Sequence, residues 1–301
     1  MAKPSDSAVD ASRRDEFHSR GREILELQTR ALDALIHDLH LLDPKKTITE
    51  IRTPLLMLQA VGVSVHSVLA LTVNRDMAIR DAFGIARSIT ETAINAAYIS
   101  VGGEEIAAQA HRHMRQKRWR DLNRKGKIGS WQIEASREVG ISEGDIPGLS
   151  SDLAEFTNKR GREIRDWTPV GVEGRITEIG ATSRPASLSL GVALFAIYRV
   201  SSEFLHGTFY GVTQFWQGSR SDPALSRDAF DDLWLSDHFI TILTAVFFAV
   251  HGAATAISEV HQFPAHQQSQ SQLAQRLRAL IEDMGGPEPE PDHTFSMHRP
   301  G

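Results

Sequence analysis

The stretch Tyr198–His206 reads YRVSSEFLH and places ionisable and hydroxyl side chains inside one of the most apolar parts of the chain. Arg199 and His206 are seven residues apart, and positions seven apart on an α-helix lie within about 20° of each other. Ser202 and Glu203 fall on the turn between them. A helix here therefore carries one polar stripe, and burying its charges without partners would cost several kcal/mol.

A second polar row occurs in the segment RSITETAINAAYI, residues 87–99, where an arginine, a glutamate and an asparagine recur every four residues. Taken with the lone Trp167 and the later Tyr-x3-Ser-x3-His-Gly pattern, this row resembles a widespread family of bacterial helical domains of unknown function. The resemblance covers roughly residues 60–260. Its residues here are Arg87, Glu91, Asn95, Tyr98, Tyr198, Ser202 and His206. Because each row is costly to bury alone, we expect the two helices to pack side by side and to form one polar cluster.

The Arg199-x6-His206 spacing is also distantly similar to the Arg-x4–6-His motif of HEPN domains, which are helical bundles of toxins and antiviral systems. In catalytic members this motif cleaves RNA without a metal ion, at a site formed across a dimer. The resemblance implies that His206 transfers protons near neutral pH and that Arg199 stabilises a phosphorane-like transition state. Two features depart from the HEPN pattern. Val200 follows the arginine where a polar residue is usual, and the motif is expected in mid-helix, in apolar surroundings.

The segment HRHMRQKRWRDLNRKGK, residues 111–127, contains eight Lys and Arg residues and a single acid, Asp121. Basic residues with an interleaved tryptophan can follow a phosphate backbone and stack on a base. The candidate nucleic-acid contacts are Arg112, Arg115, Lys117, Arg118, Arg120, Arg124 and Lys125. The alternative is a solvated helix face that pairs with acidic residues elsewhere, such as Asp228, Asp231 and Asp232.

Glu203 and His206 have the Glu-x-x-His spacing by which ferritin-like bundles bind a pair of metal ions. Those sites need two such motifs, and the other one, Glu290–His293, lies in the polar C-terminal tail. A single-metal site with Glu91, His66 and His251 as further ligands is the remaining metal hypothesis. A lone histidine in an apolar helix is more often a hydrogen-bonded core residue. No phosphate-binding loop, dinucleotide fingerprint or nucleophile elbow is present, and we expect no cofactor.

The composition is that of a globular protein, with 41% hydrophobic and 24% charged residues among 301. A formal net charge of −5 argues against a surface devoted to nucleic acid, although a local basic patch remains compatible with it. The absence of cysteine excludes disulfides and cysteine-bound zinc. The first residues lack the apolar stretch of a signal peptide, so we expect a cytoplasmic bacterial protein.

Helical periodicity runs through almost every segment, and this predicts an all-α, multi-helix bundle with long buried apolar helices. We expect a disordered N-terminus over residues 1–13, a helical bundle domain over 14–263 and a polar, mostly disordered tail over 264–301, in which Leu273–Met284 could form one more helix. Thr47–Glu50 reads as a capping box that opens a helix. Gly102-Gly103 should end the helix of the first polar row, and a short helix is expected at Gln132–Val139.

Three apolar stretches have compositions that invite a membrane interpretation, namely Leu55–Val73, Leu188–Ile197 and Phe239–Ser258. The buried helices of a large bundle have the same composition, and charged helices surround all three stretches. We therefore expect no membrane partner.

Three functional hypotheses follow, and the first two come from different classes. The first is a HEPN-like RNA-binding or RNA-cleaving effector in bacterial defence, with RNA and either a second copy or the product of a neighbouring gene as partners. The second is a non-catalytic helical interaction module whose polar rows specify helix pairing. A single-metal helical bundle is the third. The genes adjacent on the chromosome would discriminate the first two, because defence genes would favour the effector.

Overall fold

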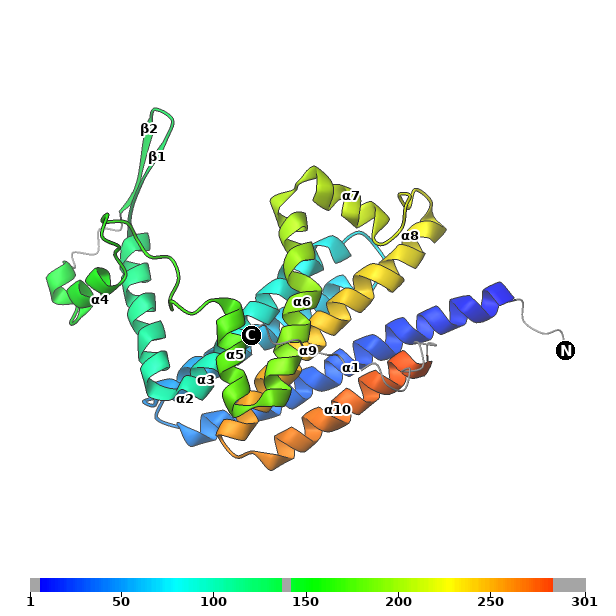
Figure 1. Ribbon diagram of the computed structural model, residues 1–301, viewed down its shortest axis with the longest axis horizontal. Helices are drawn as coiled ribbons and strands as arrows, with labels where there is room; N and C mark the ends of the chain where they lie inside the picture. Colours follow the sequence, from blue (N-terminus) through cyan, green and yellow to red (C-terminus); the bar gives the residue numbers. More distant parts are fainter. Residues whose placement is uncertain (1–5, 137–141, 284–301) are drawn as a thin grey trace, which may run out of the picture.

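A computed structural model describes residues 6–136 and 142–283, and almost all of their regular structure is α-helical (Figure 1). The predicted all-α, multi-helix bundle is thus confirmed. The main helices are α1 (Asp6–Leu42), α2 (Thr49–Leu71), α3 (Ile79–Leu122), α5 (Val172–Thr182), α6 (Arg184–His206), α9 (Ile240–Val260) and α10 (Pro264–Asp283). Shorter elements are α4 (Leu149–Glu155), α7 (Phe209–Gln217), α8 (Arg227–Leu233), the 3-10 turn η1 (Glu143–Asp145) and the π-helical segment η2 (Trp234–Phe239).

Helices α3 and α9 form the centre of the bundle. Helix α3 packs against α2, α6 and α9, and α9 packs in addition against α1 and α10. Helix α9 is buried nearly all round, from Ile242 to Ser258, as expected for a helix without a polar face. Figure 1 shows α1, α9 and α10 running side by side, and α6 crosses α9.

Helix α6 is fixed at both ends and pressed closely against α9. Its N-cap is Ser183, whose Oγ accepts a hydrogen bond from the backbone N–H of Ala186 at 3.3 Å. Its last residue is followed by Gly207, whose φ of 60° ends the helix in the left-handed region. A Cβ atom on Gly252 of α9 would lie 2.7 Å from Leu190 Cγ of α6. Glycine at this position therefore allows the two helix backbones to approach.

Gly103 breaks α3 into two parts. Its φ of 65° and ψ of −149° are non-helical, and they redirect the chain away from the bundle (Figure 1). The expected end of the helix at this glycine pair is thus a sharp change of direction, after which the helix continues to Leu122. We call residues 104–166 the arm. It contains the second part of α3, a β-hairpin and α4.

The β-hairpin of the arm was not predicted. Strand β1 (Asn123–Ile128) pairs antiparallel with β2 (Trp131–Ser136), and the helix expected at Gln132–Val139 is wrong for its described residues. A two-residue link, Gly129-Ser130, joins the strands, and Gly129 has a φ of 58°. Glycine adopts this conformation without strain, which favours a tight turn over a continued helix.

Both predicted chain ends need correction. Helix α1 begins at Asp6 rather than at residue 14. The further helix considered at Leu273–Met284 is present as α10 but begins at Pro264, so residues 264–283 are helical and not mostly disordered. Leu273, Leu277 and Leu280 form one apolar stripe on α10, and this stripe packs into the core beside α1 and α9. Residues 1–5 and 284–301 lie outside the described residues, and so does the remainder of the tail prediction.

The predicted capping box at Thr47–Glu50 is also wrong. Helix α2 begins at Thr49 and has no side-chain cap. Instead Asp43, at the end of α1, accepts hydrogen bonds from the backbone N–H groups of Thr47 and Ile48, both at 2.9 Å. The buried carboxylate of Asp43 thus organises the connection between the two helices.

Three helical stretches are long and apolar enough to cross a membrane, judged by length and composition alone: Thr49–Leu71, Arg184–His206 and Arg227–Val260. Of the most apolar 18 residues in Arg227–Val260, 72% are buried inside the bundle. The corresponding buried shares are 44% in α2 and 39% in α6. Val63 on α2 is 68% exposed and Phe195 on α6 is 92% exposed. Helices α2 and α6 therefore have exposed apolar side chains on the surface of the bundle.

Candidate functional site

Arg199 and His206 lie on the exposed side of α6, at its C-terminal end. Within the described residues, neither side chain makes a hydrogen bond or an ion pair. The expectation that this motif lies in mid-helix in apolar surroundings is wrong. His206 is the last residue of α6, and only the opposite face of the helix is buried against α9 and α3. An arginine and a histidine without internal partners are available to a ligand.

The polar rows of α3 and α6 meet through Arg87 and Tyr198. The guanidinium carbon of Arg87 lies 4.4 Å from the ring centroid of Tyr198, and Arg87 Nε donates to Glu91 Oε1 at 2.9 Å. One end of the same interface is closed by Arg80, whose Nη2 donates to the carbonyl oxygen of Phe204 at 3.0 Å. Helices α3 and α6 therefore pack side by side, as expected from the cost of burying each row alone.

Asn95 and Tyr98, in contrast, face α5 and the chain that precedes it. Arg175 donates to Asn95 Oδ1, and its guanidinium carbon lies 5.6 Å from the ring centroid of Trp167. The rings of Tyr98 and Trp167 are 5.9 Å apart. Burial raises the pKa of Tyr98, and the carboxylate of Glu178 raises it further. The polar residues of α3 were predicted to form one cluster with α6. They instead form two separate groups, one in contact with α6 and one in contact with α5.

Glu203 fixes the turn that follows the candidate histidine. Its Oε2 accepts a hydrogen bond from Thr208 Oγ1 at 2.8 Å, and Thr208 in turn caps α7 by accepting from Gly211 N at 2.9 Å. A Cβ on Gly211 would lie 2.3 Å from the carbonyl oxygen of Glu203, so α7 begins directly against the end of α6. Ser202, half-buried on the same turn, makes no side-chain hydrogen bond to the described residues.

The proposed metal ligands are not brought together. Among the described residues, no group of three or more His, Asp or Glu side chains is placed to hold a metal ion. Glu203 bonds Thr208, and His66 is exposed on α2. His251 Nδ1 is hydrogen-bonded to Ser189 Oγ at 3.1 Å, and burial lowers the pKa of this histidine. The single-metal hypothesis therefore lacks its ligand set in this part of the chain.

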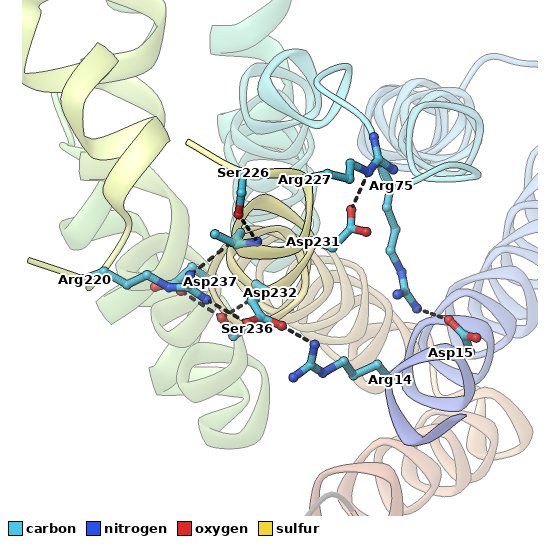
Figure 2. A network of polar contacts seen from close by, with 11 residues as sticks. Arg14, Asp15, Arg75, Arg220, Ser226, Arg227, Asp231, Asp232, Ser236 and Asp237 are labelled. Atoms are coloured by element: carbon cyan, nitrogen blue, oxygen red, sulfur yellow. Dashed lines mark hydrogen bonds and ion pairs between the residues drawn. The ribbon is translucent and has the colours of Figure 1, made fainter. Parts of the chain in front are cut away.

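The basic segment of the arm is largely paired with acidic residues. The pairs are Arg112 with Glu155, Arg115 with Asp152, and Lys117 with Asp121 and Glu163. These partners come from α3 itself, from α4 and from the chain after it, and not from the α8 region as the alternative supposed. There Asp231 pairs with Arg227, and Asp232 with Arg14 and Arg220 (Figure 2).

The remaining positive charge of this segment gathers near the hairpin. Arg118 and Arg124 are exposed and have no ionic partner in the part of the chain that is described. Arg120 donates only to neutral oxygen atoms, of Gln116, Leu153 and Thr157. Lys125 pairs with Glu134 across the hairpin at 2.8 Å. Of the seven predicted contacts, three thus retain a charge that no carboxylate of the described residues neutralises.

A polar network that sequence reasoning missed ties α1 to the region after α7 (Figure 2). Asp232 of α8 lies between Arg14 of α1 and Arg220, which also donates to the carbonyl oxygen of Ala229 at 3.0 Å. Arg75 binds Asp15 of α1 at 2.6 Å. The residues of this polar network come from distant parts of the sequence and have no regular spacing. A periodic sequence pattern therefore could not predict the network.

Comparison of the chain with protein-family models, with curated proteins and with solved structures gives no match. The two family resemblances of the sequence therefore stay predictions. The fold and the site define an all-α bundle with an exposed arginine–histidine pair at the end of a bundle helix.

Proposed function

We propose that this protein is a HEPN-like effector that binds and cleaves RNA without a metal ion, through Arg199 and His206, in the bacterial cytoplasm. The observation that carries the proposal is the contrast within the polar rows. Arg87, Glu91 and Asn95 have protein partners, whereas Arg199 and His206 face solvent without one among the described residues.

The chemistry requires two proton transfers and one stabilised charge. The ribose 2′-hydroxyl loses its proton to a base and attacks the adjacent phosphorus atom. The bond from phosphorus to the 5′-oxygen breaks, and that oxygen takes a proton from an acid, which leaves a 2′,3′-cyclic phosphate and a 5′-hydroxyl. Neutral imidazole serves as the base and imidazolium as the acid. Arg199 binds the non-bridging oxygens, and it lies about 10 Å from His206 along the helix axis.

A single histidine cannot act as base and acid in the same step, so a second copy of the chain supplies the other one. Helix α6 offers a surface for this contact next to the motif. Leu188, Phe195, Tyr198 and Leu205 are exposed on it. They are spaced seven, three and seven residues apart, the spacing by which two helices pack along a common seam. A dimer through this seam would bring the two copies of Arg199 and His206 close together.

The second candidate is a non-catalytic interaction module. It is favoured by the contacts of Arg87 with Glu91 and Tyr198, and of Arg175 with Asn95, which fix how α3 pairs with α6 and α5. In that case the polar rows specify helix pairing, and the exposed pair on α6 has no chemical role.

The test is RNA cleavage by the purified protein in the presence of a chelator. We expect His206→Ala and Arg199→Ala each to lower the cleavage rate by about a hundredfold or more, with little change in stability because both side chains are exposed. His66→Ala, which removes an exposed histidine from α2, is the matched control. A His206→Ala protein that cleaves as fast as the wild type would contradict the proposal.

A further inference from the structure

The β-hairpin of the arm extends away from the bundle (Figure 1), and it carries an apolar face that is exposed to solvent. Its register pairs Ile128 with Trp131 and Gly126 with Ile133, so these side chains share one face. Ile128 is 67% exposed, Trp131 75% and Ile133 52%. A two-stranded hairpin is only marginally stable alone. An exposed aromatic face on such an element indicates a binding partner.

A polar cavity of about 730 Å³ lies at the base of the hairpin. Its cationic lining residues are Lys117, Arg120, Arg124, Lys125 and Arg165, and Trp119 adds an aromatic ring. The cavity's own carboxylates, Asp121 and Glu163, are both engaged by Lys117.

Three arginines at this cavity keep their charge uncompensated. Arg120 is held in place by neutral acceptors, at 2.7 Å from Gln116 Oε1 and 2.6 Å from Thr157 Oγ1. Arg124 and Arg165 are exposed, and their side chains have no ionic partner among the described residues. A fixed guanidinium without a carboxylate, beside two further free ones, is suited to bind phosphate.

We infer that the hairpin and this cavity together form a binding site for single-stranded RNA, with phosphates bound by Arg120, Arg124 and Arg165 and an unpaired base stacked on Trp131. The choice of RNA over DNA rests on the proposed function. The site itself rests on an exposed tryptophan and uncompensated arginines, which is the combination by which proteins bind single strands. Trp131 lies on the same face of the hairpin as Arg124, about 13 Å along the strands from it. Stacking on Trp131 requires an unpaired base, because a duplex hides the base faces.

Charge selects this ligand over the other partners of an apolar face. A second copy of the chain would bring its own uncompensated arginines to the contact, and like charges repel. An anionic membrane surface would attract the arginines, but it would leave the polar cavity at the base of the hairpin unoccupied. A chain of phosphates and bases accounts for both the cavity and the tryptophan.

The experiment measures binding of a short fluorescein-labelled oligouridine to the full-length protein by fluorescence anisotropy, in the His206→Ala background so that the RNA stays intact. Trp131→Ala should weaken binding about tenfold or more relative to the His206→Ala parent. Trp131→Phe keeps an aromatic face for stacking and should bind nearly as well as that parent. Arg124→Glu should also weaken binding, whereas Arg276→Glu, at an exposed position of α10, should not. Three phosphate contacts predict that log K falls against log salt concentration with a slope of about −2.

Equal affinity of the wild type, Trp131→Ala and Arg124→Glu proteins would overturn the inference. So would protein that binds anionic vesicles through Trp131 and leaves oligouridine unbound. The two proposals fail separately. Oligouridine binding that depends on Trp131, in a protein that cleaves no RNA, would remove the catalytic proposal only. Cleavage by the wild type with unchanged binding by Trp131→Ala would remove only this inference.

Discussion

The guanidinium of Arg87 stacks on the ring of Tyr198, with 4.4 Å between its central carbon and the ring centroid. This contact joins α3 to α6 one residue before Arg199. Arg87 also binds Glu91 of its own helix, so its position is fixed from two sides. The α6 segment that carries the exposed pair is therefore anchored to the centre of the bundle by a polar contact.

Removing this anchor should cost stability. We expect Arg87→Ala to lower the free energy of unfolding by about 1 kcal/mol, from the loss of a cation–π contact and an ion pair along the helix. In a double-mutant cycle with Tyr198→Ala, measured by chemical denaturation, the coupling energy should be about 0.5–1 kcal/mol. Strictly additive single effects would show that the two side chains do not interact.

Gly211 should tolerate no side chain. A Cβ there would meet the carbonyl oxygen of Glu203 at 2.3 Å, so Gly211→Ala must push α7 away from the end of α6. We expect a loss of about 1–3 kcal/mol in the free energy of unfolding. Gly191→Ala is the matched control, because nothing lies within 4 Å of a Cβ at that position of α6. It should leave stability unchanged or raise it by up to about 1 kcal/mol through helix propensity.

Stability should fall as the pH drops below 6.5, in part through His238. Burial among aromatic rings lowers the pKa of this histidine, although its Nε2 bonds the Phe215 carbonyl oxygen at 2.9 Å and Asp237 lies beside it. The folded protein thus binds the proton at a lower pH than the unfolded chain, whose histidine pKa is 6.5. Between these two values the unfolded state holds more protons, so folding becomes less favourable as acid is added.

Replacing His238 by glutamine isolates this contribution, because glutamine retains a donor for Phe215 and does not titrate. Denaturation at several pH values should then give a shallower fall below pH 6.5 than in the wild type, by at most about 1.4 kcal/mol per pH unit. Identical slopes in the two proteins would mean that His238 is not buried in its neutral form.

Within the arm, Asp152 should be the carboxylate that matters for stability. It is 1% exposed and accepts two hydrogen bonds from Arg115, at 2.7 and 3.1 Å. We expect Asp152→Ala to destabilise the arm by about 1–3 kcal/mol, measured by hydrogen exchange of its helical amides. Glu155→Ala breaks the more exposed pair with Arg112 and should cost less than about 1 kcal/mol. Equal effects would show that burial of the pair is unimportant.

A charge on the α6 seam should prevent the proposed dimer. We expect Phe195→Glu to shift the protein from dimer to monomer in analytical ultracentrifugation and to abolish RNA cleavage with it, because like charges would face each other across a symmetric contact. Val63→Glu, at an apolar position of α2 that is 68% exposed, should change neither. A wild type that sediments as a monomer at assay concentrations and still cleaves RNA would contradict the dimer.

Local signals in the sequence sufficed for the elements that carry the candidate site. Ser183 followed by Pro185 marks the start of α6 through capping chemistry that acts within a few residues. The end of α6 at Gly207 was missed, because the Arg199–His206 motif was expected in mid-helix. The all-apolar stretch of α9 predicted a fully buried helix for the same local reason. That α3 and α6 would pack together followed from the cost of burying their polar rows.

The errors arose where distant residues decide the outcome. Whether Asn95 bonds α6 or Arg175 of α5 depends on helix rotation, which no sequence spacing fixes. Asp43 displaced the expected cap of α2 because the connection folds back onto the end of α1. The hairpin strands are only six residues long, too short for alternation to stand out from a polar background. Arg199 and His206 were expected to be buried because the sequence around them is apolar. Only the opposite face of α6 is buried, and both residues are exposed.

The chain leaves the bundle at Gly103 and returns to it at Trp167. The ring centroid of Trp167 lies 5.9 Å from the ring centroid of Tyr98 on α3. Departure and return therefore occur at nearly the same place on α3. A segment with neighbouring ends can be excised and the gap rejoined by a short peptide without rerouting any bundle helix. By the position of its two ends, the arm is thus an insertion into the bundle.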